Sequence, residues 1–416
     1  MYTLAARNHA SGGESAMHCR RPAALLGTLV GAALMLGLPG CSQPGGDSTR
    51  IGVITSLTGS QAAFGAAHKN GYAIALDEIN AKGGVLGKKV ALDFYDDQSK
   101  PDQAVQGVSK LFDQDHVPVI LGSYSSESTK AIVPSVIQRQ VPLMIPTATA
   151  DNVMDSKSPW VFRICAGAAD YARTTVEFLK SSGAPKTMAI VYENTNFGQS
   201  NMRAMSEAAK AAGITLVAVE PYEAKSPDYK SVLQRVKQAN PEVIYFCSYL
   251  LDAGTLMRQA HEVDLNPKYY TSAGTGFAAA EFPTPKGAAK NAEYTFSVSQ
   301  WLPESRWPGA KEFDAEYVRR TRSHPAYHAI EAYEALQVVV QAINGARTLD
   351  RAAIRDAIRN LDLGSTPFGP IKFDANGQNR HPVMITQVQG GRYHIVYPAD
   401  TADTKPVIPA PPWSRR

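Results

Sequence analysis

Residues 50–97 read RIGVITSLTGSQAAFGAAHKNGYAIALDEINAKGGVLGKKVALDFYDD and contain one complete strand–helix–strand unit. The apolar run at 50–56 predicts a buried strand. Apolar side chains then recur at helical spacing from Tyr72 to Ile79, which predicts an amphipathic helix. Residues 88–97 alternate apolar and polar side chains, which predicts a second strand. Such a unit is typical of a parallel sheet covered by helices.

The same alternation continues through most of the chain. A first series ends near residue 146, and a second series of the same kind begins at residue 187. We therefore expect an α/β fold with two lobes, each a doubly wound parallel sheet with helices on both faces. Further strands are expected at 117–121, 142–146, 187–192, 215–222, 242–248 and 268–272, and further helices at 101–113, at 198–213 and after Ser126, Pro227 and Ser248.

The last third of the chain does not begin a third domain of this kind. It predicts a strand at 294–299 and helices at 308–322, 326–346 and 350–361. A β-rich end follows, in which QGG at 389–391 indicates a hairpin between two runs rich in Val, Ile and Tyr. Two lobes need such segments if the chain crosses between them several times. We expect one lobe at 50–166 plus 298–376 and the other at 167–297 plus 377–397.

The N-terminal segment predicts export from the cytoplasm. Two arginines precede an uncharged run, rich in Leu and Ala, of about 16 residues, which is too short to span a membrane and typical of a secretory signal. The run ends in LGLPGC, which resembles the lipobox of bacterial lipoproteins, so Cys41 is the expected lipidation site. An ordinary signal peptide with a chance cysteine is the alternative. Residues 1–40 are thus the expected leader, with Met17 as an alternative start, and 41–49 are an expected flexible tether.

Composition limits the partners and the number of domains. The formal net charge is +4, and the three arginines and one glutamate of the leader account for half of it. So mild a charge argues against a nucleic-acid partner. About 350 residues lie between the two ends, which suits two domains better than one core. The Pro-rich end at 398–416 is expected to be disordered.

No catalytic constellation stands out in the sequence. It contains no Gly-rich loop ending in Gly-Lys-Ser/Thr, no GxSxG motif and no HExxH motif. Cys165 and Cys247 follow apolar, strand-like runs and are expected to be buried packing residues. Asp96 and Asp97 are expected to form a structural turn. We therefore expect no enzymatic activity, no metal ion and no cofactor.

The stretch LGSYSSESTKAIVPSV, at 121–136, is rich in hydroxyl side chains. It joins a predicted strand to a predicted helix. A helix start leaves backbone N–H groups unpaired and favours a negative charge. Hydroxyls beside those groups could hold an anion such as a carboxylate. In the alternative, Ser126 or Ser128 simply caps the helix.

The chain resembles a known family over essentially its whole mature length. Residues 51–105 are similar to the opening of periplasmic Leu/Ile/Val-binding proteins, the substrate receptors of branched-chain amino-acid ABC importers. The most specific motif is INAKGGVLGKK followed by YDD, and the similarity continues through GSYSSEST, PLMIPTATA, IVYENTNFGQS, EVIYFCSYLLDAG and YHAIEAYEAL. The resemblance implies a type I periplasmic binding protein, in which three crossovers join two lobes and a ligand is closed into the cleft.

The resemblance also implies residue roles. Ser126 matches the serine that holds the ligand carboxylate, and Thr149 matches a threonine that helps to hold the same ligand. The backbone of Thr147 and Ala148 lies beside it. A buried hydrogen bond to a charged group contributes about 1.5–3 kcal/mol, so a few of them favour the anion-binding interpretation of residues 121–136. Aromatic rings around the ligand are implied at Phe64, Phe197 and Tyr249.

One departure from the family concerns the ammonium group of an amino-acid ligand. Amino-acid binders of the family hold this group with an acidic residue near the end of a strand in the second lobe. The corresponding stretch, 269–277, contains no Asp or Glu, and Ala273 or Gly274 takes the matching place. An unpaired ammonium in a closed cleft is costly. Either the ligand has no amine, or another carboxylate substitutes, for which the candidates are Glu193, Asp252 and Glu331.

The leader predicts a lipid-anchored, extracytoplasmic protein, and the resemblance implies a substrate-binding protein that acts as a monomer with an ABC permease and ATPase. Its ligand is expected to be a small carboxylate, by default a branched-chain amino acid, which is captured by hinge closure. Two alternatives remain open. The same fold could bind an amine-free carboxylate, an amide or urea, or it could serve as a ligand-sensing receptor.

Overall fold

The computed structural model describes residues 48–416. The predicted leader, the predicted lipidation site Cys41 and most of the predicted tether lie outside the described residues. Within the described range, no helix is both long enough and apolar enough to cross a membrane.

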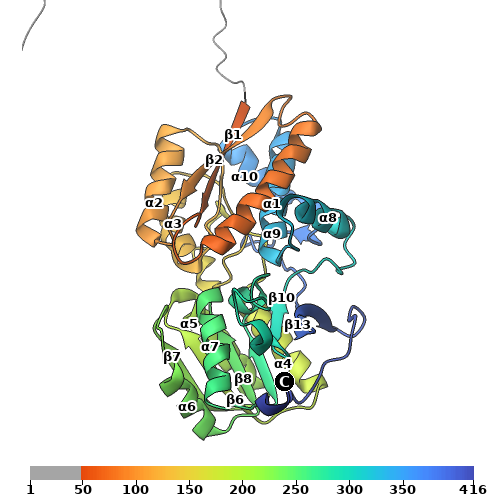
Figure 1. Ribbon diagram of the computed structural model, residues 1–416. Helices are drawn as coiled ribbons and strands as arrows, with labels where there is room; N and C mark the ends of the chain where they lie inside the picture. Colours follow the sequence, from red (N-terminus) through yellow and green to blue (C-terminus); the bar gives the residue numbers. More distant parts are fainter. Residues whose placement is uncertain (1–47) are drawn as a thin grey trace, which may run out of the picture. The chain divides into compact units, whose positions relative to one another are not determined.

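The first lobe is built on a five-stranded sheet (Figure 1). The strand order is β2-β1-β3-β4-β5, and all neighbouring strands run parallel, as predicted. The central strand β3 is shorter than the predicted strand at 117–121, since Pro118 has no N–H group to donate to a neighbour. The strands are β1 (Ser48–Thr55), β2 (Lys89–Asp96), β3 (Ile120–Leu121), β4 (Leu143–Ile145) and β5 (Val161–Arg163).

Helices cover both faces of this sheet. They are α1 (Ala62–Ala81), α2 (Pro101–Ser109), α3 (Ser126–Gln138), α8 (Ala310–Thr321), α9 (Tyr327–Ala346) and α10 (Arg351–Asn360). Successive residues of a strand point to opposite faces. Ile51 and Val53 therefore pack in the core formed with α1, α9 and α10, whereas Ile54 packs with α2 and α3. The helix predicted at 101–113 is regular only to Ser109 and continues as a short π-helix, η1 (Lys110–Gln114).

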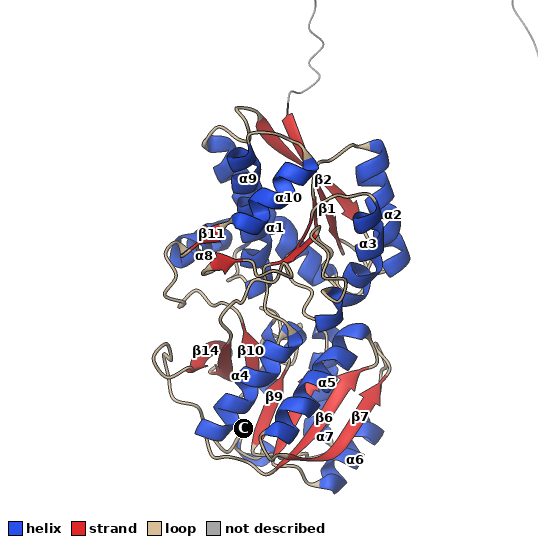
Figure 2. Cartoon of the chain, turned by 180° about the vertical axis from the view of Figure 1, so that it is seen from behind, coloured by secondary structure: helices blue, strands red, loops and turns tan. Residues whose placement is uncertain are grey.

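The second lobe has a four-stranded parallel sheet with the order β7-β6-β8-β9 (Figure 2). A bridge between Tyr270 and Thr295 continues it into an antiparallel sheet with the order β10-β13-β14. The strands are β6 (Thr187–Glu193), β7 (Thr215–Tyr222), β8 (Val243–Cys247), β9 (Tyr269–Ser272), β10 (Phe296–Ser299), β13 (Met384–Gln389) and β14 (Arg392–Tyr397). The helices are α4 (Ala168–Ser181), α5 (Asn196–Ala211), α6 (Lys230–Ala239) and α7 (Leu250–Glu262).

The predicted hairpin near the C-terminus is confirmed. Gly390 and Gly391 connect β13 to β14 and have φ angles of 61° and 76°. A two-residue hairpin turn with positive φ at both positions matches the right-handed twist of its strands, and glycine adopts it without strain.

The chain passes between the lobes three times. It leaves the first lobe after β5, returns after β10 into α8, and leaves again before β13. A small two-stranded sheet, formed by β11 (Asp362–Leu363) and β12 (Ile371–Lys372), packs in the core of the first lobe before the last crossing. We propose that these three crossings form the hinge.

The C-terminal end differs from the expectation of disorder at 398–416. Trp413 is buried, and its indole N–H donates to the Leu265 carbonyl at 2.6 Å. The same ring stacks on His261, and the Arg416 guanidinium lies 3.8 Å from its centroid. The expectation was wrong because the Pro-rich composition gives little weight to one tryptophan, and burial of its ring helps to dock the segment on the second lobe.

Candidate functional site

One buried carboxylate holds three strand-end loops of the first lobe together. Asp97 accepts hydrogen bonds from the Ser56 hydroxyl at 2.6 Å and from the Ser123 hydroxyl at 2.5 Å. The Ser99 N–H donates to the same carboxylate at 2.9 Å. These serines follow β1, β3 and β2, so Asp97 fixes three loops at the carboxyl edge of the sheet. Ligands of open α/β sheets bind at this edge.

The start of α3 brings Ser126 to a neighbouring loop. Ser125 caps the helix, because its hydroxyl accepts the Ser128 N–H at 3.1 Å. The alternative that Ser126 or Ser128 is the cap is therefore wrong. The Ser126 hydroxyl instead accepts the Ala150 N–H at 3.2 Å. It thus joins α3 to the loop after β4, which carries the other predicted carboxylate-binding residues.

That loop, residues 147–150, presents a buried hydroxyl. The Thr147 side chain is engaged, since it donates to the Tyr124 carbonyl at 3.1 Å. The Thr149 side chain is also buried, but its hydroxyl has no hydrogen-bond partner among residues 48–416. Buried polar groups are normally hydrogen-bonded. Thr149 is therefore well suited to donate to a ligand.

Arg163 supports the same loop from behind. It is 3% exposed, and its Nη1 donates to the carbonyls of Ala148 at 3.1 Å and Ala150 at 2.9 Å. Its Nε donates to the Gln378 side chain at 2.6 Å. The local sequence does not show whether this arginine lies at the hinge or on the surface. The contacts place it inside the protein, between the loop and the last crossing.

Replacing Arg163 by Met is expected to lower the free energy of unfolding by about 3 kcal/mol, because the two carbonyls lose a charged donor in a buried place. Affinity for any ligand held by residues 147–149 should fall with it. Urea unfolding followed by circular dichroism measures the first effect. Arg173→Met is the control, since its side chain is 59% exposed and pairs at the surface. Equal effects for both variants would contradict the buttressing role.

Aromatic rings from both lobes meet beside these loops. Phe64 of the first lobe stacks on Tyr124 with a centroid distance of 4.6 Å. Phe197 of the second lobe lies 5.0 Å from Tyr249, and Tyr249 lies 6.2 Å from Phe64. The three predicted rings are thus brought together. Sequence reasoning missed Tyr124, although it lies within the hydroxyl-rich stretch, and His328, whose ring is 4.9 Å from Phe64.

Direct hydrogen bonds also join the lobes. The Glu127 carboxylate accepts the Phe197 N–H at 3.0 Å and the Tyr249 hydroxyl at 3.4 Å. Asn152 and Asn196 exchange side-chain hydrogen bonds at 2.6 and 2.9 Å. The first lobe therefore holds the start of α5 and the ring of Tyr249, which come from two different loops of the second lobe.

The loop after β9 carries no charge where the family resemblance implies an acid. Ala273 is buried, and its N–H donates to the Phe246 carbonyl at 2.8 Å. The Tyr327 hydroxyl reaches this loop from α9 and accepts the Thr275 N–H at 3.0 Å. A phenol thus lies beside the place where the family has a carboxylate.

The three carboxylates that could replace the acid missing near Ala273 have different surroundings. Asp252 accepts the Lys225 N–H at 3.1 Å and the Tyr229 hydroxyl at 2.8 Å, which is a structural role. Glu193 lines a small cavity of about 140 Å³ between the lobes, together with Glu127 and Asp252. Burial, followed by the charges of those two carboxylates, raises the pKa of Glu193 to about 8. Glu331 lies deep in the first lobe.

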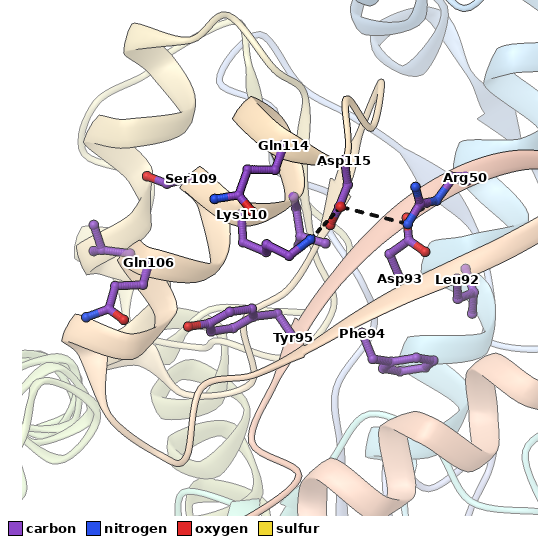
Figure 3. A pocket seen from close by; sticks show the side chains of 12 residues that line it. Arg50, Leu92, Asp93, Phe94, Tyr95, Gln106, Ser109, Lys110, Gln114 and Asp115 are labelled. Atoms are coloured by element: carbon purple, nitrogen blue, oxygen red, sulfur yellow. Dashed lines mark hydrogen bonds and ion pairs between the residues drawn. The ribbon is translucent and has the colours of Figure 1, made fainter. Parts of the chain in front are cut away.

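A surface cavity of about 740 Å³ in the first lobe does not resemble a ligand site. It lies between β2 and α2, and its charged side chains pair with one another (Figure 3). Arg50 pairs with Asp93 at 2.6 Å, and Lys110 pairs with Asp115. Mutually paired surface charges are weakly stabilising and leave little charge for a ligand. We therefore assign no function to this cavity.

Both remaining cysteines behave as packing residues. Cys165 and Cys247 are buried and carry free thiols. Burial raises the pKa of each thiol well above its usual range. A thiol held neutral in this way is a poor nucleophile, which agrees with the predicted packing role.

Comparisons with known proteins agree with this geometry. A family model described as periplasmic binding protein matches residues 48–392. The chain is 29% identical over 397 residues to Leu/Ile/Val-binding protein homolog 7 of Brucella suis, covering 91% of this chain and 97% of that protein.

Solved structures show the same fold. A branched-chain amino acid transporter substrate-binding protein from Streptococcus pneumoniae, in complex with isoleucine, superposes with a TM-score of 0.77 at 23% identity, covering 84% of this chain and 100% of that one. A solute-binding protein of an ABC transporter from Rhodopseudomonas palustris, in complex with 3,4-dihydroxybenzoic acid, gives 0.76 at 22% identity, covering 83% and 95%. The type I two-lobed fold predicted from the sequence is thereby confirmed.

Proposed function

Because this chain belongs to the periplasmic binding protein family, we propose that it is the substrate-binding component of an ABC importer and captures a small carboxylate ligand between its lobes. The observation that carries the proposal is the meeting of Phe64 with Tyr249, together with the buried hydroxyl of Thr149, which has no hydrogen-bond partner among residues 48–416. Rings from both lobes can enclose an apolar group while one polar edge holds a carboxylate. Sites of this kind are mostly apolar with a few placed donors.

In the proposed complex, the ligand carboxylate binds at the start of α3 and on the loop after β4. Ser126 and Thr149 supply hydroxyls, and the backbone of Thr147 and Ala148 lies beside the carboxylate. The rings of Phe64, Phe197 and Tyr249 enclose the rest of the ligand. A branched-chain amino acid is the default ligand, and the Brucella relative and the isoleucine complex support it.

An amine-free aromatic or aliphatic carboxylate is the second candidate. Two observations favour it. The loop at Ala273 offers no carboxylate to an ammonium group, and the Rhodopseudomonas neighbour was solved with an aromatic acid. No contact among residues 48–416 specifically favours an amide, urea or a sensing role.

Transport would depend on closure of the lobes about the three crossings. The Glu127 bonds to α5 and Tyr249 form only when the lobes meet, so they add to the contacts that a ligand makes with both lobes. The closed form would then dock on a permease that is driven by an ATPase. We further propose that the chain is a monomer tethered outside the cytoplasm by a lipid at Cys41 and that it has no enzymatic activity.

A thermal-shift panel tests the proposed function. The protein starting at Ser42 is washed under denaturing conditions, refolded, and mixed with Leu, Ile, Val and Phe, with their 2-oxo acid counterparts, and with benzoate, simple amides and urea. A ligand at about 100 times its dissociation constant adds about 2.7 kcal/mol, which raises the melting temperature by several degrees. A carboxylate should produce this shift. If only amides or urea do so, carboxylate capture is refuted.

Thr149→Val, which keeps the side-chain shape, is expected to weaken binding of the carboxylate ligand by about 10- to 150-fold, because one hydrogen bond to a charged group contributes about 1.5–3 kcal/mol. Isothermal titration with the ligand found in the panel measures the change. The control is Thr175→Val, a buried threonine whose hydroxyl donates to the Tyr171 carbonyl within α4. Unchanged affinity in Thr149→Val would remove this residue from the site.

A further inference from the structure

One carboxylate in the first lobe is buried without a partner. Glu331 of α9 is 0% exposed, and within residues 48–416 neither of its oxygens has a hydrogen-bond partner. Burial alone raises its pKa well above the usual range. A buried polar group without a hydrogen bond is costly. A bound group that donates hydrogen bonds to Glu331 would remove this cost.

Glu331 lies next to the proposed ligand site. It is three residues after His328, on the same face of α9, and the His328 ring lies 4.9 Å from Phe64. Its charge contributes to raising the pKa of Cys165, whose thiol contacts the Ala148 carbonyl at 3.7 Å. His328 and Glu331 therefore lie on one face of α9, and that face meets the ring of Phe64 at His328.

Glu331 is also close to the loop that lacks an acid. Tyr327 lies one turn before it on α9, and its hydroxyl accepts the Thr275 N–H at 3.0 Å. After burial, the charge of Glu331 is the largest cause that raises the pKa of Tyr327. The helix α9 thus brings a carboxylate near the side of the site where Ala273 provides none.

The other two candidate carboxylates already have partners. Asp252 accepts hydrogen bonds from the Lys225 N–H and the Tyr229 hydroxyl. Glu193 accepts the Tyr249 N–H at 3.5 Å and faces the small cavity between the lobes. Of the three, Glu331 is the one whose two oxygens both lack a hydrogen-bond partner among residues 48–416.

We propose that Glu331 accepts the α-ammonium group of the ligand, so that the substrate class is apolar α-amino acids and the acid missing near Ala273 is replaced from the first lobe. The ligand carboxylate binds Ser126 and Thr149 while its ammonium group turns toward α9. This inference rests on the proposed function, since it names the second polar contact of the same site.

Titration calorimetry of the Glu331→Gln variant tests the inference. Gln keeps the size of the side chain and removes its charge, so the affinity for Leu, Ile or Val should fall by at least about 30-fold, the factor equivalent to 2 kcal/mol for an unpaired buried charge. The affinity for the matching 2-oxo acid, which has no ammonium group, should change by less than about threefold.

Glu334→Gln provides the matched control. Glu334 lies on the same helix and is 1% exposed, but its carboxylate faces Thr366 and Phe368. It should leave both affinities unchanged. The role of Glu331 is overturned if the two variants lose the same affinity, or if Glu331→Gln loses the same affinity for the amino acid as for the 2-oxo acid.

The panel separates failure of this inference from failure of the proposed function. Binding of amine-free acids without binding of amino acids keeps carboxylate capture and overturns the inference. If no carboxylate binds, both are overturned. Binding of Leu, Ile or Val with full affinity in Glu331→Gln also keeps the function and overturns the inference.

A second measurement needs no variant at this position. Burial raises the pKa of Glu331, and pairing with an ammonium group lowers it again, so binding should release protons at the pH values at which the free carboxyl holds its proton. Comparing binding heats in two buffers of different ionisation enthalpy measures the release, and Glu193→Gln should not abolish it. Absence of release overturns the inference. The titratable neighbours are kept neutral by burial and are Tyr124, Cys165, Tyr171, Tyr327, His328 and His68.

Discussion

Replacing Asp97 by Ala is expected to lower the free energy of unfolding by about 4.5 kcal/mol, because three hydrogen bonds to a buried carboxylate are lost at about 1.5 kcal/mol each. The carboxylate is 0% exposed and accepts from Ser56, Ser99 and Ser123. These donors belong to three separate loops. Their loss should also loosen the loop that leads to α3, so ligand affinity should fall as well.

Urea unfolding at pH 7, followed by circular dichroism, measures the stability of Asp97→Ala. Asp97→Asn should lose about half as much, since the amide keeps one oxygen acceptor for the serine hydroxyls. The control is Asp155→Ala on an exposed side chain, with an expected change within about 0.5 kcal/mol. A change of that small size in Asp97→Ala would show that the three loops hold their positions without the carboxylate.

The sequence predicted the parallel lobes well because their signal is local. The spacing of apolar residues in 50–97 depends only on which faces of β1, α1 and β2 are buried. The two glycines at 390–391 are required only by the conformation of the turn that they form. The strand predicted at 117–121 was too long, because Pro118 lies in the same apolar run and lacks the N–H group that a strand needs. The spacing of apolar residues does not show this loss. The docked C-terminal end was missed because composition averages over a single tryptophan, Trp413.

The site was predicted only where residue types carry the signal. Hydroxyls at the start of α3 and rings after strands could be found by inspection, and the resemblance assigned them roles. Arg163 could not be placed, because its partner Gln378 is 215 residues away in the chain. The burial of Glu331 could not be predicted either, because the local sequence does not show whether a glutamate in a helix is exposed or buried. Long-range placement is what the fold adds.

Glu193→Gln is expected to stabilise the protein at pH 8 and to leave it unchanged near pH 4. The unfolded carboxyl ionises near its usual pKa of 4.5, whereas in the fold the pKa is raised to about 8 by burial and by the charges of Asp252 and Glu127. Between these values the folded state binds more protons than the unfolded state. The contribution of the Glu193 carboxyl to the free energy of unfolding is therefore fully present below pH 4.5 and is lost as the pH rises toward 8. Gln cannot ionise and removes this loss.

The size of the effect follows from the shift. One pKa unit corresponds to about 1.4 kcal/mol, which gives an upper limit of about 5 kcal/mol, and we expect about 3 kcal/mol because opening of the lobes can hydrate the carboxylate. Urea unfolding at pH 4, 6 and 8 measures it. The control is Glu207→Gln, an exposed position on α5, which should keep the wild-type slope. If Glu193→Gln keeps that slope too, the Glu193 carboxyl of the wild-type protein is hydrated and the cavity between the lobes is open to water, whereas loss of the slope means that ionisation of Glu193 destabilises the folded protein as the pH rises.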